Sequence, residues 1–171
     1  MIYIDIGAYD GDTLAKGISK FPDCTAYFGF EPDPDNFAKL KERFGDNPKV
    51  IIYSIAIGTN PKLYKGATPE SHSGYASKFN VSSKFILVET LDIIAFLKDY
   101  PDEDITLKIN AEGAEYPILE KMIETGWIHH VKRLYIQWHV EKIGEISMER
   151  HNHLIAQLKE IKIPIRSVRS L

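Results

Sequence analysis

The sequence has few of the features that mark secreted, membrane-spanning or polyanion-binding proteins. One cysteine, Cys24, occurs among 171 residues, so no disulfide can form within the chain and a reducing, cytoplasmic location is expected. No apolar run is long enough to cross a bilayer, and no signal-peptide pattern precedes the first apolar run. The formal net charge is only −3, which gives no global signal for nucleic acid or an anionic membrane.

What is present is typical of a globular α/β chain. A hydrophobic content of 44% and 171 residues suit one domain, residues 1–171, with a full core. Apolar runs alternate with helical patterns, which predicts a mostly parallel sheet with helices on both faces. Strands are predicted near residues 1–6, 26–30, 50–56, 86–89, 104–110, 133–139 and 163–169. Helices are predicted near residues 12–20, 34–44, 91–99, 114–126 and 147–160.

One segment departs from this alternation. Residues 59–84 are rich in Gly, Pro, Ser, Thr and Lys and have no clear period. Long segments of this kind inside a compact domain are usually functional or mobile loops. We therefore predict a loop on the substrate side of the site.

The most informative motif is the stretch YIDIGAYDGDT at residues 3–13. A short apolar run ends in Asp5, and Gly7 and Gly11 follow. A second apolar run ends in Glu31, twenty residues after Gly11. Glycines allow close backbone approach, a helix N-terminus offers free N–H groups, and an acid on the next strand suits a ribose diol. The pattern predicts a nucleotide-type cofactor where two parallel strands end.

The acidic residues of this turn favour a methyl donor over a dinucleotide. The G-x-G-x-x-G turn that holds a pyrophosphate is absent, and Asp5, Asp10 and Asp12 would repel one. S-adenosylmethionine carries an ammonium and a sulfonium and no phosphate, so it suits such a turn. Asp5 is expected to meet the ammonium, and Ala56 and Ile57 to border the adenine at the end of the third strand. The predicted cofactor-binding residues are Asp5, Gly7, Ala8, Tyr9, Asp10, Gly11, Thr13, Glu31, Pro32, Ala56 and Ile57.

Candidate catalytic residues follow two later strands. Lys108, Asn110 and Glu112 lie at the end of a central strand, beside the switch point where such sheets bind ligands. His139 ends the next predicted strand, and its ordinary pKa suits a general base, although a hydrogen-bonded strand-end histidine is an equal interpretation. Glu112 is expected to orient an acceptor or to act as base, and Lys108 to be buried or paired. Because Asn110 is uncharged, no metal is expected here.

Four blocks together resemble a known family. They are YIDIGAYDGDT, FGFEPDPDNF, VETLDIIAFL and LKINAEGAEYPIL, which begin at residues 3, 28, 88 and 107, and a weaker LYIQWH follows at residue 134. The chain resembles the FkbM family of S-adenosylmethionine-dependent methyltransferases, which have the Rossmann-like class I fold. The resemblance implies the strand order 3-2-1-4-5, extended by a short C-terminal strand region, and methyl transfer to a hydroxyl oxygen. Asn110 and Gln137 depart from the pattern, which usually has acids there.

Three hypotheses follow. The first is an S-adenosylmethionine-dependent methyltransferase that acts on a hydroxyl of a small molecule or saccharide, without nucleic acid or membrane as partner. The second is a binding module that keeps the cofactor site with little or no turnover. The third, a nucleotide-dependent oxidoreductase, is disfavoured by the absent G-x-G-x-x-G. Because the first strand starts almost at Met1, a second copy of the chain is expected as a candidate cover for the site.

Overall fold

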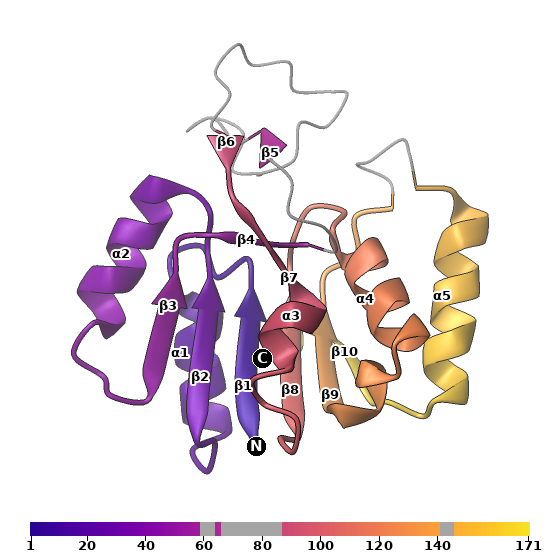
Figure 1. Cartoon of the computed structure of the whole chain (residues 1–171), viewed down its shortest axis with the longest axis horizontal. Coiled ribbons are helices and arrows are strands. Elements are labelled where there is room, and N and C mark those ends of the chain that lie inside the picture. Colours follow the sequence, from indigo (N-terminus) through magenta and orange to yellow (C-terminus); the bar gives the residue numbers. More distant parts are fainter. Residues whose placement is uncertain (59–63, 66–86, 141–145) are drawn as a thin grey trace.

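A six-stranded parallel sheet forms the centre of the protein in the computed structural model, which describes residues 1–58, 64–65, 87–140 and 146–171. Its order is β10-β9-β8-β1-β2-β3 (Figure 1). All five strand pairings in it are parallel, so the carboxyl ends of its strands meet at one edge. The strands are β1 (Ile2–Ile6), β2 (Ala26–Phe30), β3 (Val50–Tyr53), β8 (Ile105–Ile109), β9 (Val131–Ile136) and β10 (Ile165–Ser167).

The order 3-2-1-4-5 implied by the family resemblance is confirmed for the central sheet, in which β8 and β9 are the fourth and fifth strands, and β10 extends it by one strand. β1 and β8 lie at the centre, and every residue of both strands is buried. Parallel strands covered on both faces need near-continuous apolar sequence, which explains why Asp5 and Lys108 stand out in these two runs. The register places Asp5 directly beside Lys108 on one side and Gly29 on the other.

The helices divide between the two faces of the sheet. On one face, α1 (Asp12–Lys20) and α2 (Pro34–Phe44) pack Leu14, Leu40 and Phe44 into a cluster around Tyr3 and Tyr27. The opposite face holds the larger core, formed with the helices α3 (Ile93–Leu97), α4 (Glu115–Glu124) and α5 (Met148–Glu160). Figure 1 shows α1 behind the sheet and α3 and α4 in front of it. Helices on both faces are therefore confirmed.

Cap residues fix where these helices begin. Asp33 accepts hydrogen bonds from Asp35 N and Asn36 N, and Pro34 occupies the first turn of α2. Asp92 caps α3 in the same way. Because Asp92 provides this cap, the helix predicted from residue 91 begins at Ile93 instead.

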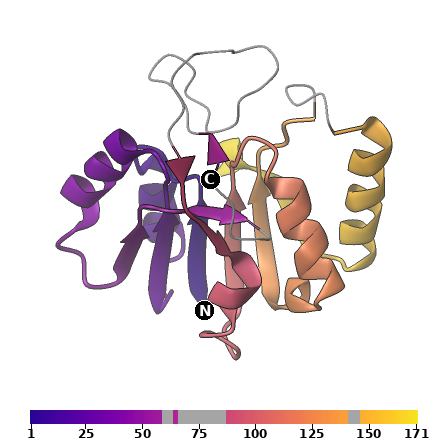
Figure 2. The same cartoon turned by 45° about the horizontal axis from the view of Figure 1, so that its top comes forward.

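The predicted third and fourth strands are wrong in their bounds. The run 50–56 bends at Ser54, so β3 ends at Tyr53 and β4 (Ala56–Gly58) pairs with β7 (Thr90–Asp92) in a separate two-stranded sheet. Figures 1 and 2 both show β4 running crosswise to the central strands. The predicted strand 86–89 gives only the short β6 (Leu87–Val88), which pairs with β5 (Tyr64–Lys65) outside the central sheet. An apolar run alone does not reveal such a bend.

Three predicted elements in the C-terminal part of the chain end earlier than expected. Gly126, at a φ of 79°, ends the helical segment, and η1 (Trp127–His130) leads into β9. The predicted strand 133–139 ends at Ile136, so His139 lies in the loop beyond it. After β10, η2 (Val168–Ser170) replaces the end of the predicted strand 163–169.

The predicted loop 59–84 lies outside the described residues, apart from β5. In the part of the chain that is described, no helix has both the length and the apolar character that a membrane crossing requires.

Candidate functional site

The turn after β1 is fastened to the end of β2 by three hydrogen bonds. Gly7 N and Ala8 N both donate to Phe30 O at 3.0 Å. Tyr9 N donates to Glu31 Oε2 at 2.8 Å. Gly7 has a φ of 75°, and an added Cβ would overlap the carbonyl oxygen of Asn110 on the neighbouring strand end. The turn is thus held rigidly against both β2 and β8.

These bonds also decide what the turn can bind. Besides the N–H groups of residues 7, 8 and 9, Gly11 N donates to Ala8 O and Asp12 N to Asp10 Oδ1. A pyrophosphate cradle needs such N–H groups free to face the phosphate. In this turn these N–H groups donate to protein oxygens instead. The structure therefore gives a second argument against a dinucleotide, one that the sequence could not provide.

Asp5, Asp10 and Asp12 are not three free carboxylates, so they would repel a pyrophosphate less than expected from the sequence. Asp5 is paired with Lys108, and Asp12 is paired with Arg43 at 2.8 Å. Only Asp10 lacks a cation among the described residues of this turn. The turn is therefore closer to electrical neutrality than its sequence suggests.

Asp5 lies beneath the turn and does not face the ligand side. Its side chain is 0% exposed, with Oδ1 at 2.7 Å from Lys108 Nζ and Oδ2 accepting from Thr13 Oγ1 at 2.6 Å. Burial raises the pKa of Asp5, and the charge and hydrogen bonds of its partners act in the opposite direction. The expectation that Asp5 meets a cofactor ammonium does not fit this geometry.

Glu31 occupies the position expected for an acid that binds a ribose. It is 6% exposed and accepts from Tyr9 N through Oε2 and from Asp33 N, at 2.9 Å, through Oε1. Burial raises the pKa of Glu31, while the two backbone donors lower it. Each carboxylate oxygen can accept more than one hydrogen bond, so Glu31 can still take hydroxyl donors. Pro32 follows it and is partly exposed.

A second cluster joins the ends of β8 and β9. Glu115 Oε1 accepts from His139 N and contacts His139 Nδ1, both at 3.0 Å, and Glu115 Oε2 accepts from Gly113 N at 2.7 Å. On the other side of the ring, His139 Nε2 lies 3.4 Å from Glu112 Oε1. Glu115 is fully buried, whereas the Glu112 side chain keeps 21% exposure. The structure thus brings together two of the predicted catalytic residues, Glu112 and His139, and adds a second acid, Glu115.

The protonation of His139 differs from the expectation. Burial alone would lower the pKa of His139, but hydrogen bonds to Glu112 and Glu115, and their charges, raise it to about 9. At neutral pH the ring is therefore an imidazolium, which cannot accept a proton. His139 as a general base is the part of the prediction that the structure does not favour.

Glu115 was only partly recognisable from the sequence. Its position three residues after Glu112 fits either pairing with that acid or a place in the first turn of a helix. It does begin α4, but its carboxylate turns inward to His139, 24 residues away. Nothing local in the sequence indicates this contact.

Backbone strain marks the same two turns. The described residues include three non-glycine positions with positive φ, and two of them are Tyr9 (53°) and Glu112 (49°). Strain of this kind concentrates at functional sites, where surrounding bonds hold it. Just past the end of β8, Asn110 Oδ1 is a buried acceptor without a hydrogen-bond donor among the described residues. A ligand can provide that donor, as can water or an ion.

Ala56 and Ile57 do not end the third strand. Both lie on β4, and the side chain of Ile57 is buried in the larger core. Ile57 is therefore a packing residue in this structure, and the predicted adenine contact at a central strand end is wrong in its location.

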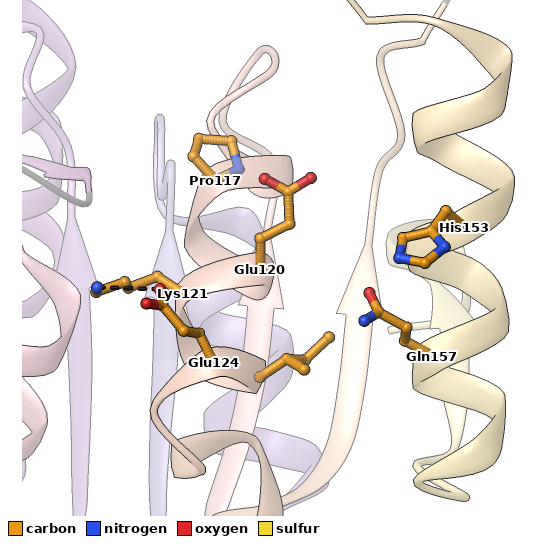
Figure 3. Close-up of a pocket in the computed structure, with 7 residues that line it drawn as sticks. Pro117, Glu120, Lys121, Glu124, His153 and Gln157 are labelled. Atoms are coloured by element: carbon orange, nitrogen blue, oxygen red, sulfur yellow. Dashed lines mark hydrogen bonds and ion pairs between the residues drawn. The ribbon is translucent and has the colours of Figure 1, made fainter.

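A hollow of about 570 Å³ lies between α4 and α5, away from these turns (Figure 3). Its lining includes no predicted site residue; it consists of Pro117, Glu120, Lys121, Ile123, Glu124, His153 and Gln157. It is lined by helix surfaces and takes no part in the candidate site.

Comparison with known proteins agrees with this geometry. The model of the FkbM methyltransferase domain matches residues 5–161. The chain belongs to the FkbM methyltransferase family. Membership supports a methyltransferase function and confirms the resemblance carried by the sequence blocks.

One solved structure shares the fold, a methyltransferase FkbM from Methylobacillus flagellatus KT. Its TM-score is 0.57 at 20% identity, and the match covers 90% of this chain and 36% of that one. The likeness at this identity shows the fold, and the chain spans little more than a third of the other protein's length. No curated protein sequence is significantly similar to the chain.

Proposed function

We propose that the protein is an S-adenosylmethionine-dependent methyltransferase that acts on a hydroxyl oxygen of a small molecule or saccharide. The observation that carries this proposal is the hydrogen-bonding character of the site: it presents hydrogen-bond acceptors to a ligand and few free hydrogen-bond donors. Glu31 and Asn110 Oδ1 are acceptors, while the N–H groups of the β1 turn are used internally. The ammonium and ribose hydroxyls of S-adenosylmethionine are donors, so the residues present fit this cofactor.

The chemistry asked of the protein is modest. When bound, the cofactor supplies a methyl group already activated on a sulfonium. The protein would then have to orient the acceptor oxygen towards that methyl group and take up the proton of the acceptor hydroxyl. Glu112, the partly exposed member of the second cluster, takes the hydroxyl proton and orients the acceptor. His139, as an imidazolium, holds the Glu112 carboxylate in place.

A binding module with little turnover is the second candidate. The neutral side chains of Asn110 and Gln137, and a His139 held protonated, favour it because each reduces the basic groups near an acceptor. This candidate predicts cofactor binding by calorimetry but no transfer of a labelled methyl group to any hydroxyl compound in a broad panel. One methylated product would exclude it.

Compartment and assembly belong to the same proposal. A reducing cytoplasm fits the single, buried Cys24.

A second copy of the chain is proposed as a cover for the site, and sedimentation with and without cofactor tests this.

Replacing Glu31 with glutamine tests the cofactor site. The substitution removes the charge, and its amide nitrogen cannot accept from Tyr9 N or Asp33 N as a carboxylate oxygen does. We therefore expect S-adenosylmethionine to bind about 10- to 100-fold more weakly in calorimetry, because hydrogen bonds to charged groups contribute about 1.5–3 kcal/mol. Glu42→Gln, an exposed acid on α2, is the matched control and should bind as the wild type does. Equal affinity in Glu31→Gln and the control would contradict the site.

A further inference from the structure

Lys108 makes contacts that leave its ammonium closed to any substrate. It is 1% exposed, and its Nζ lies 2.7 Å from Asp5 Oδ1. The same nitrogen donates to Gly7 O at 2.6 Å and reaches Ile6 O at 3.4 Å. Gly7 O and Ile6 O thus accept hydrogen bonds from the ammonium, and the Asp5 carboxylate pairs with its charge. The expectation that Lys108 is buried or paired is therefore confirmed, whereas its place among the candidate catalytic residues does not fit these contacts.

The contacts place Lys108 under the turn that forms the candidate donor site. Gly7 is held at positive φ, with its carbonyl bound by Lys108 from β8 and its N–H bound by Phe30 O from β2. Asp5 continues the network to α1, because its second oxygen accepts from Thr13 Oγ1. One buried network therefore joins β8, the β1 turn and the start of α1.

A charge at this position needs a reason beyond stability. Burying an ion pair costs desolvation that its attraction does not reliably repay, and apolar replacements of similar shape are often as stable. An apolar side chain at residue 108, however, could not bind Gly7 O. The feature that only the ammonium provides is the fixed orientation of the Gly7 peptide.

We propose that Lys108 is a positioning residue for donor binding: its buried ammonium, with Asp5 as counterion, holds the Gly7 turn in the conformation that receives S-adenosylmethionine. This rests on the proposed function. It assigns Lys108 and Asp5 to the protein side of the site, where they touch no ligand and act through the backbone of the turn.

The test removes both charges together, because Lys108→Met alone would leave the Asp5 carboxylate buried without its cation. In the double variant Asp5→Asn/Lys108→Met, the amide oxygen of residue 5 can still accept from Thr13. We expect an unfolding midpoint in urea close to that of the wild type, and S-adenosylmethionine binding in calorimetry about ten-fold weaker or more, because the Gly7 carbonyl is released.

The matched control removes an ion pair elsewhere. Arg150 on α5 binds Glu120 on α4 through two hydrogen bonds of 2.7 and 2.6 Å, far along the chain from the turn. Arg150→Met/Glu120→Gln should leave cofactor affinity unchanged. Wild-type affinity in the Asp5/Lys108 double variant would overturn the proposal, whereas a wild-type protein that fails to bind S-adenosylmethionine would overturn the proposed function itself.

Thr13→Val decides the matter if the double variant does not fold. It keeps the ion pair and removes only the hydroxyl that joins Asp5 to α1. We expect binding about three- to ten-fold weaker, with secondary structure by circular dichroism unchanged. Unaltered affinity in Thr13→Val would count against the network as a positioning device.

Discussion

Gly7→Ala is expected to lower the free energy of unfolding by about 3–5 kcal/mol, a large part of the stability of a domain of this size. Two effects combine. Residue 7 has a φ of 75°, a conformation that costs an L-residue about 1–2 kcal/mol. The added Cβ would also overlap the backbone carbonyl of Asn110, which cannot rotate away as a side chain can. Urea unfolding followed by circular dichroism measures the loss.

Gly126→Ala separates these two effects. Gly126 has almost the same φ, 79°, but an added Cβ there would have nothing within 4 Å. It should therefore show only the conformational cost, about 1–2 kcal/mol. If Gly7→Ala cost no more than Gly126→Ala, the close approach of the β1 turn to Asn110 would be wrong.

Glu115→Gln is expected to destabilise the protein by about 3 kcal/mol at pH 7. The carboxylate that raises the pKa of His139 is lost, and the amide that replaces it cannot serve His139 and Gly113 N equally well. His139 has a pKa raised from 6.5 to about 9, so its contribution is complete below pH 6.5 and is lost as the pH rises through 9. The difference from the wild type should thus shrink markedly by pH 10.

Two measurements check this pH dependence. Urea unfolding at pH 7 and pH 10 gives the change in stability, and NMR titration of the His139 ring should show its pKa falling in Glu115→Gln. Glu124→Gln, on the same helix but with its side chain 70% exposed, is the control and should change stability by less than about 0.5 kcal/mol at either pH. A loss for Glu115→Gln that is equal at both pH values would contradict an imidazolium at residue 139.

The places of the central strands and of α1, α2 and α5 follow from the sequence alone, and the strand order follows from the family resemblance that its motifs carry. The elements are marked by local signals, such as apolar runs of strand length and Asp33-Pro34 at a helix start, and the expected site by glycines after a strand that ends in an acid. Such signals act within a few residues, so they survive without knowledge of the fold. The bend at Ser54 and the crosswise β4 cannot be predicted in this way, because they depend on pairing with β7, more than thirty residues away.

The chemical state of the site was decided by the tertiary structure. The sequence predicts that Asp5, Lys108, Glu112 and His139 lie near one edge of a sheet. It does not predict which of these charged groups pair with each other. Register sets Lys108 beside Asp5 and both side chains are buried, and the fold brings Glu115 onto His139. A pKa depends on burial and on charges within a few ångströms, whatever their distance along the chain. For that reason the sequence by itself determined the family and the fold and gave an expected location for the site, while only the folded chain showed which charged side chains are buried and paired and which stay partly exposed.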